Sequence, residues 1–171
     1  ILSALSSPPT ADETDVLPLA INAQQTKVTQ NTTALEQILN DGLTNILFVG
    51  RIAPNKRIED HLRLAEHYRR YVDADYRFIC VGRTDAVPHY YSALRTQMLD
   101  YGLPSDRFLF PGMVPEEELA VYYRHAHAYL SLSEHEGFCV PLIEAMAADV
   151  PVMAYGVTAV PETLGGAGVC F

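Results

Sequence analysis

Short apolar runs alternate with amphipathic stretches between residues 45 and 155, and this alternation restricts the fold more than any other feature of the sequence. An unbroken apolar run that ends near a glycine or a turn signal is typical of a strand buried on both faces of a sheet. The sequence therefore predicts five strands, at residues 46–49, 78–81, 107–110, 128–132 and 151–155.

The stretches between these strands carry helical patterns. Residues 57–72 place apolar side chains at steps of three and four, namely at Ile58, Leu62, Ala65, Tyr68 and Val72. Further helices are predicted at 33–39, at 91–101, from Pro115 as a first helical residue, and at 141–148. Strand and helix repeated with short connections give right-handed crossovers, so we predict an α/β domain with a doubly wound parallel sheet. Such sheets bind ligands outside the carboxyl ends of their strands.

Composition excludes several classes of protein. Twelve Lys and Arg residues stand against 21 Asp and Glu residues, and the formal net charge of −9 argues against nucleic-acid binding and against general binding to anionic membranes. Cys80, Cys139 and Cys170 lie far apart without a CxxC pair, which indicates a reducing compartment and no zinc site. No apolar run reaches membrane-spanning length and no export signal is visible, so we expect a soluble, cytoplasmic chain.

The ends of the sequence suggest how the chain is organised. Residues 1–15 have the composition of a linker or tail, a short strand is expected at 16–20, and residues 16–171 are expected to form the folded domain. The chain begins at Ile1 and stops within the apolar run 168–171, where a strand is expected to continue. We therefore expect a fragment of a longer protein.

The loop after the first strand gathers positive charge. Arg51, Lys56 and Arg57 lie within eight residues of Gly50 in an acidic chain, and an anionic ligand such as a diphosphate is a simple reason for this. The alternative is that Lys56 and Arg57 are solvated residues at a helix start. The loop matches neither GxxxxGK[ST] nor GxGxxG, which excludes a P-loop and a dinucleotide fingerprint.

The loop after the fourth strand, residues 133–140, runs into the helix expected at 141–148. Gly137 allows a ligand close to the backbone, and a proline-initiated helix is expected to leave the amides of Leu142 and Ile143 free for an anion. Glu136 and Glu144 flank this helix start, and carboxylates there suit sugar hydroxyls rather than phosphate. The alternative reading makes Glu144 a helix-surface residue and Glu136 an ordinary loop acid.

Other side chains invite readings that we set aside. His125, His127 and His135 could suggest a metal site, but their neighbours favour packing or solvent exposure. Cys139 lies near a helix start that would lower its pKa, yet no histidine is spaced to act as its base. We therefore predict neither a metal centre nor a cysteine nucleophile.

An ordered series of motifs then produces a resemblance. EGFCVPLIEAMA at 136–147 carries an E-x7-E spacing, PVMAY follows at 151–155, and FVGRIAPNKR and FPGMVPEEEL stand at 48–57 and 110–119. Together with Pro161-Glu162 and the glycines of 165–168, the series resembles the C-terminal, donor-binding domain of retaining GT-B glycosyltransferases of family 4. The likeness covers about residues 16–171 and implies a Rossmann-like fold that is one half of a two-domain enzyme.

The resemblance implies roles for individual residues. Arg51 and Lys56 match the basic pair that holds the donor diphosphate, Glu136 the acid that contacts the donor sugar, and Glu144 the acid that holds the ribose. Backbone and pocket contacts to the donor are implied for Gly50, Gly137, Phe138, Cys139, Val140 and, at the base, for Met113 and Val114. The chain departs from the family pattern at Arg57, Cys139 and Asp149, where glycine is common. We expect Arg57 to add a phosphate contact or to point into water.

The implied activity belongs to the complete enzyme. It would transfer a sugar from a UDP-, GDP- or ADP-sugar to an acceptor hydroxyl with retention, in glycan, polysaccharide or glycolipid synthesis, without a cofactor or metal. The acceptor glycan or lipid-linked sugar would bind the N-terminal domain, so this fragment alone is expected to be inactive, and the whole protein could associate peripherally with the inner membrane face. A GT-B epimerase or phosphorylase and a non-catalytic nucleotide-sugar-binding module remain alternatives.

Overall fold

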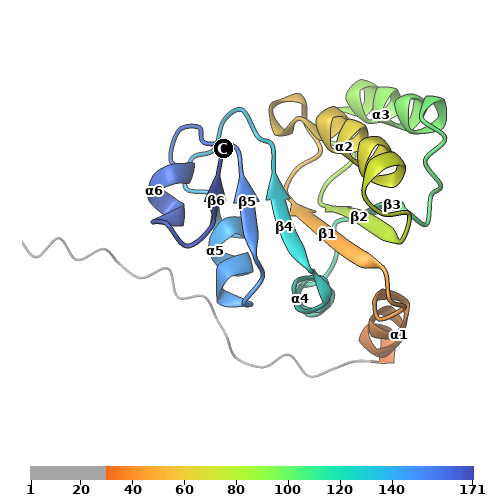
Figure 1. Ribbon diagram of the computed structural model, residues 1–171, viewed down its shortest axis with the longest axis horizontal. Coiled ribbons are helices and arrows are strands. Elements are labelled where there is room, and N and C mark those ends of the chain that lie inside the picture. The colour runs from red at the N-terminus through yellow and green to blue at the C-terminus, as the bar shows by residue number, and fades with distance from the viewer. Residues whose placement is uncertain (1–29) are drawn as a thin grey trace, which may run out of the picture.

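The chain forms a six-stranded parallel sheet with the strand order β3-β2-β1-β4-β5-β6 (Figure 1). The computed structural model describes residues 30–171. Every neighbouring pair of strands is parallel, which confirms the predicted doubly wound fold class. The strands are β1 Thr44–Val49, β2 Tyr76–Val81, β3 Phe108–Gly112, β4 Ala128–Ser131, β5 Val152–Ala154 and β6 Val169–Cys170.

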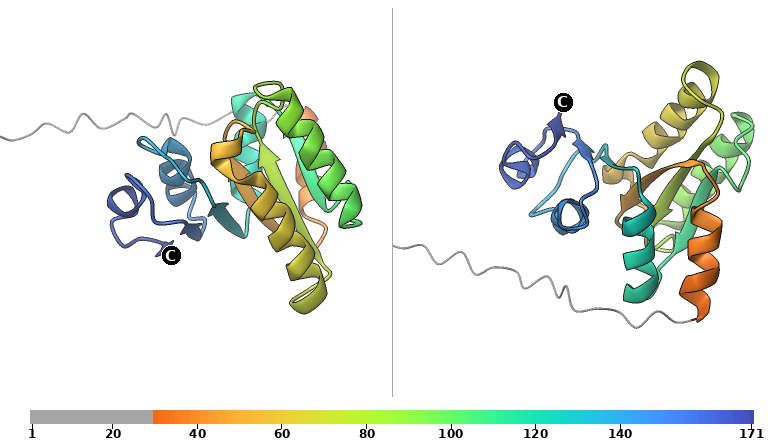
Figure 2. Two further views of the ribbon diagram at one scale, coloured as in Figure 1. Left: turned by 90° about the horizontal axis from the view of Figure 1, so that it is seen from above. Right: turned by 60° about the horizontal axis from the view of Figure 1, so that its bottom comes forward.

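Helices cover both faces of this sheet. Figure 2 shows α1 and α4 side by side on one face and α2 with α3 on the other. Helices α5 and α6 pack on the same face as α1 and α4. The helices are α1 Gln30–Leu39, α2 Ile58–Tyr71, α3 Pro88–Asp100, α4 Glu116–His125, α5 Val140–Ala147 and α6 Val160–Leu164, with a short 3-10 turn at Pro54–Lys56 before α2.

Two apolar layers hold the sheet between these helices. Alternate residues of a strand point to opposite faces, so Leu47 packs with Tyr129 under α4 while Phe48 packs with Phe78 under α2. Phe78 and Phe108 stack in the second layer with their ring centroids 5.8 Å apart. Burial of these large side chains supplies the main stabilisation of the sheet.

Several element boundaries differ from the sequence-based expectation. Pro115 has an extended backbone and caps α4 rather than forming its first residue, so the acids of residues 116–118 occupy the first turn. Helix α5 begins one residue early, at Val140, because Cys139 takes a left-handed conformation that caps it. The sequence pattern did not indicate α6, whose five residues are too few for a helical period.

The strand order reverses between β1 and β4, and this reversal sets the position of a ligand crevice. The loops that follow these two strands leave the same edge of the sheet side by side. A close approach marks this edge, since a Cβ at Gly82, with φ 147°, would lie 2.0 Å from the carbonyl oxygen of Gly50. Only glycine therefore allows β1 and β2 to end so near each other.

Some expectations fall outside the part of the chain that the structure describes. The linker expected at residues 1–15 and the strand expected at 16–20 both precede residue 30. Within residues 30–171, no helix combines the length and the apolar character that a membrane crossing requires.

Candidate functional site

An ion pair joins the loops after β1 and β4 at the reversal point of the sheet. The Nζ atom of Lys56 donates to Oε1 of Glu136 at 2.6 Å, and the two side chains are only 14% and 10% exposed. Two residues that are 80 positions apart and were both expected in the site are thus in direct contact. The low exposure strengthens their attraction compared with a surface pair.

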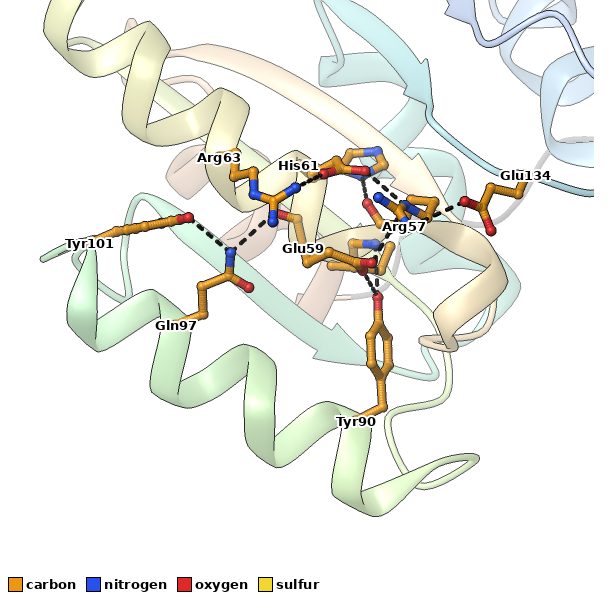
Figure 3. A network of polar contacts seen from close by, with 10 residues as sticks. Arg57, Glu59, His61, Arg63, Tyr90, Gln97, Tyr101 and Glu134 are labelled. Carbon is orange, nitrogen blue, oxygen red and sulfur yellow. Dashed lines mark hydrogen bonds and ion pairs between the residues drawn. The ribbon is translucent and has the colours of Figure 1, made fainter.

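The same two loops are tied by further contacts. The amide of Glu134 donates to the carbonyl of Asn55 at 2.9 Å, and Arg57 forms an ion pair with Glu134 at 3.2 Å. Figure 3 shows Arg57 between Glu134 and the start of α2, where it also pairs with Glu59 and Asp60. Arg57 does not simply point into water as one expectation had it, because three carboxylates hold its guanidinium, and the phosphate contact expected for it stays a prediction.

A buried histidine connects this loop to β4. His61 lies on α2 with its side chain shielded from solvent, and its ring nitrogens face the carbonyl oxygens of Arg57 at 3.1 Å and Leu130 at 3.3 Å (Figure 3). Burial lowers the pKa of His61 below its ordinary value of 6.5, and the nearby backbone carbonyls offset this only in part. The neutral ring therefore acts as a fixed spacer between the two elements.

Thr158, in the loop between β5 and α6, holds the backbone of Glu136. The amide of Glu136 donates to Oγ1 of Thr158 at 3.0 Å, and the Thr158 hydroxyl donates to the carbonyl of Glu136 at 2.5 Å. Sequence reasoning missed this residue, because a single threonine in a loop shows no spacing that relates it to a backbone 22 residues away.

Among residues 30–171, four residues other than glycine have left-handed backbone conformations, and three of them lie in the loops of the candidate site. Arg57, Cys139 and Thr158 have φ values of 52°, 54° and 48°, and Asp149 at the end of α5 has φ 56°. Arg57, Cys139 and Asp149 are the positions at which the family pattern often has glycine, which adopts this region freely. A side chain in this region costs about 1–2 kcal/mol, so these three positions carry backbone strain that glycine would avoid.

The start of α5 differs in one respect from the expected anion site. The amide of Leu142 donates to the carbonyl of Cys139 at 2.9 Å, so it is not free for a ligand as predicted. A Cβ on Gly137 would meet nothing within 4 Å, and the neighbouring Phe138 is 54% exposed, which leaves open space beside the loop. Val140 is half-buried as the first residue of the helix.

The surroundings of the Cys139 thiol disfavour the thiolate that a nucleophile requires. Its side chain is 7% exposed, and burial, followed by the charge of Glu136, raises the pKa of the thiol to about 12. The positive charge of Lys56 opposes this shift without reversing it. Cys139 is therefore a neutral packing residue beside the Lys56–Glu136 ion pair.

Glu144 has a partner that sequence reasoning also missed. The phenol of Tyr123, on α4, donates to Oε2 of Glu144 at 2.7 Å. Burial raises the pKa of Tyr123 above its ordinary value, and the neighbouring Tyr129 and Glu144 add to the shift, so the phenol stays a donor. Burial also raises the pKa of Tyr129, with smaller contributions from both Glu136 and Glu144. The two acids of the E-x7-E spacing thus act on one buried tyrosine.

The remaining expected residues lie at the same edge without joining these contacts. Arg51 is exposed and has no side-chain partner among residues 30–171. Gly50 donates its amide to the carbonyl of Val81 at 2.9 Å, so this amide is used within the sheet. Met113, directly after β3, is 73% exposed, whereas Val114 packs against the core.

The histidines at 125 and 127 lie at the opposite edge of the sheet. The amide of Asn45, at the start of β1, donates to Nδ1 of His127 at 3.0 Å, and the Asn45 side chain donates to the carbonyl of His125. His135 is exposed. In the described part of the chain, no group of three or more His, Cys, Asp or Glu residues is placed to hold a metal ion.

Comparison with known proteins relates this arrangement to one family. Residues 31–168 match the family described as Glycosyl transferases group 1. The O-antigen chain mannosyltransferase B of Escherichia coli is 29% identical over 123 residues, which are 72% of this chain and 31% of that protein. The 2-deoxystreptamine glucosyltransferase of Streptomyces kanamyceticus is 32% identical over 126 residues, which are 69% of this chain and 29% of that protein.

A solved structure shows the same fold. The C-terminal domain of a glycosyl transferase group 1 family protein from Francisella tularensis has a TM-score of 0.68 at 22% identity, and the match covers 85% of this chain and 75% of that one. The chain spans about a third of the length of the two curated relatives. With the family match extending over most of its length, the chain belongs to the group 1 glycosyl transferases, and its Rossmann-like sheet is of the GT-B type.

Proposed function

We propose that this chain is the donor-binding domain of a retaining hexosyltransferase that uses a nucleoside-diphosphate sugar. The observation that carries the proposal is the buried contact between Lys56 and Glu136 at the reversal point of the sheet. A cation for a diphosphate and an acceptor for sugar hydroxyls stand side by side there, and Glu144 lies one helical turn into α5. The mannosyl- and glucosyltransferase relatives support the transfer of a hexose.

Each group has a role that its charge allows. Lys56 turns from Glu136 to the diphosphate when the donor binds, and the exposed Arg51 adds a bidentate contact. Glu136, released from Lys56, accepts hydrogen bonds from sugar hydroxyls, and Glu144 accepts them from the ribose. The open space at Gly137 admits the sugar ring, and the exposed Met113 lies where the base is expected.

The chemistry requires stabilisation of a leaving group. The bond between the anomeric carbon and the diphosphate oxygen breaks, and the nucleoside diphosphate leaves with the electron pair. The acceptor oxygen bonds to the anomeric carbon on the same face, and its proton passes to the departing diphosphate oxygen. Cations fixed at the diphosphate stabilise the charge that develops in this step, which is the largest contribution that a protein makes to such a transfer.

A binding titration of the 171-residue chain tests the donor site. UDP, GDP and ADP are compared with their monophosphates by calorimetry, and we expect one diphosphate to bind at least about tenfold more tightly than its monophosphate, because a charge-assisted contact contributes about 1.5–3 kcal/mol. Lys56→Met and Arg51→Ala should each reduce this preference. Arg95→Ala, which removes an exposed arginine from α3, is the matched control. Equal binding of mono- and diphosphates, or no binding, would refute the proposal.

Activity is tested on the full-length protein. We expect transfer with retention of the anomeric configuration, followed by NMR of the product, and no turnover by the 171-residue chain alone, because the acceptor site is assigned to another domain. Recovery of an epimerised nucleotide sugar or of a sugar phosphate would instead identify an epimerase or a phosphorylase. We place the reaction in the cytoplasm, where nucleotide sugars are made, and fractionation of cells tests association with the inner membrane face.

A further inference from the structure

Tyr123 reaches from one helix to a functional acid on another. It lies on α4, and its hydroxyl is 2.7 Å from Oε2 of Glu144 on α5, 21 residues away in the chain. The same hydroxyl lies 3.4 Å from the carbonyl oxygen of Pro141, at the edge of hydrogen-bonding distance. The contact thus joins the last turn of α4 to the first turns of α5.

The Tyr123 ring is held in place by its packing, whereas the longer side chain of Glu144 can adopt several rotamers. The Tyr123 side chain is 6% exposed, and its ring stacks on Tyr129 with the centroids 6.5 Å apart. A glutamate side chain loses about 1.5–2 kcal/mol of rotamer entropy when it is fixed in one place. The hydrogen bond from the Tyr123 hydroxyl restricts the Glu144 side chain before a ligand binds, so less rotamer entropy is lost on binding.

The geometry also limits which oxygen of Glu144 a ligand can use. Oε2 receives the Tyr123 hydrogen bond, and within residues 30–171 no contact to Oε1 is found. Glu144 borders a shallow hollow of about 240 Å³ between α4 and α5, so its carboxylate is reachable from solvent. Tyr123 also lines this hollow, but at 6% exposure most of its ring is covered by its neighbours.

We infer that Tyr123 is the positioning residue for Glu144, and that by holding Oε2 it aims Oε1 at the ribose hydroxyls of the donor and makes binding selective for ribonucleotides. This inference rests on the proposed donor site. Tyr123 belongs to none of the sequence motifs and looks in the sequence like an ordinary buried helix residue, yet the inference gives it a role in specificity.

The test compares two ligands that differ only in the hydroxyls that Glu144 is proposed to bind. The nucleoside diphosphate selected by the titration above is compared with its 2′,3′-dideoxy analogue on the 171-residue chain. We expect the wild type to prefer the ribonucleotide by about 10–100-fold, as hydrogen bonds to a carboxylate allow. Tyr123→Phe should reduce this ratio by about fivefold or more while binding of the dideoxy analogue stays unchanged.

Two further variants separate positioning from structure. Tyr122→Phe makes the same change at a neighbouring buried tyrosine of α4 and should retain the wild-type ratio. Glu144→Gln should lower the ratio, and adding Tyr123→Phe to it should lower the ratio no further, because the two residues act through one contact. Urea unfolding of each variant checks that the fold is retained.

The outcomes distinguish the two proposals. A wild-type chain that binds no nucleotide refutes the donor site and the Tyr123 inference together. A wild type that discriminates and a Tyr123→Phe variant that discriminates equally well refute the inference and leave the donor site standing. If Tyr123→Phe lowers the affinity for both ligands by the same factor, the role of Tyr123 is purely structural and the inference is also overturned.

Discussion

Thr158 and Glu136 hold each other through two reciprocal hydrogen bonds, in which the Thr158 hydroxyl both accepts from the amide of Glu136 and donates to its carbonyl. Thr158 does this at φ 48°, a region that a β-branched residue rarely occupies. Strain of this kind persists where the surroundings over-determine it, and it clusters at functional sites. The hydrogen bonds thus offset the strain and place Glu136 where it meets Lys56.

Substitutions at Thr158 should separate the hydrogen bonds from the strain. Thr158→Val keeps the branched shape but loses both hydrogen bonds, so we expect the free energy of unfolding to fall by about 1–3 kcal/mol. Thr158→Gly loses the same bonds but relieves the strain, so its loss should be smaller, and Thr158→Ser should stay near the wild type. Urea denaturation measures all three. A valine variant as stable as the wild type would show that the contact contributes nothing.

The Lys56–Glu136 contact should show strong coupling in a double-mutant cycle. Lys56→Met leaves a carboxylate buried without a partner, and we expect it to cost about 2–4 kcal/mol of the free energy of unfolding. Glu136→Gln should cost less, and the double variant should be more stable than the sum of the two losses predicts. The three variants and the wild type are compared by urea denaturation at neutral pH and moderate salt. Additive losses would contradict a direct pair.

His61 should make the fold sensitive to acid. Its pKa is lowered in the folded state by burial, with Asp60 and Glu59 opposing the shift only weakly, so below pH 6.5 the unfolded chain binds the proton more readily. Stability is therefore complete above this pH and is lost as the pH falls. We expect His61 to account for up to about 1.4 kcal/mol of the loss between pH 7.5 and 5.5.

His61→Gln provides the comparison, because it removes the titrating ring. The difference in unfolding free energy between the variant and the wild type should shrink as the pH falls from 7.5 to 5.5, whatever its size at pH 7.5. A difference that stays constant over this range would show that His61 does not titrate differently in the two states.

Asp149 offers a stabilising substitution outside the candidate site. It follows the last turn of α5 at φ 56°, where the amides of Asp149 and Val150 donate to Met146 and Ala145 in the pattern of a Schellman motif. Glycine suits this position, so Asp149→Gly should raise the free energy of unfolding by about 0.5–1 kcal/mol. Asp149→Ala should lower it, because alanine tolerates this conformation less well than aspartate. Thermal and urea unfolding rank the three proteins.

Much of the fold could be predicted because its signals are local. The strands β1, β2 and β4 are each recognisable from a short apolar run in the sequence. The parallel sheet follows from the alternation of these runs with helices. The meeting of Lys56 and Glu136 was predictable in outline too, since each follows a strand of such a sheet and loops of this kind share one edge.

The contacts that fix the site were not predictable, because each depends on the path of a loop in space. Thr158 acts on a backbone, which no side-chain pattern reveals. The hydrogen bond between Tyr123 and Glu144 depends on the packing of α4 against α5, and Tyr123 carries the ordinary signal of a buried helix face. The ion pairs of Arg57 were not foreseen, because its three carboxylate partners come from two separate segments of the chain.

Lys56 and Glu136 neutralise each other in the absence of a ligand. A ligand that separates them has to offer an anionic group to Lys56 and hydrogen-bond donors to Glu136. A bare phosphate that captured Lys56 would strand a carboxylate in a poorly hydrated place, and a free sugar that captured Glu136 would strand an ammonium group. A molecule that carries a diphosphate and a sugar together satisfies both. On the proposed donor site, we therefore expect a nucleotide sugar to bind more tightly than the nucleoside diphosphate alone or the free sugar alone, because only the nucleotide sugar leaves neither charge without a partner.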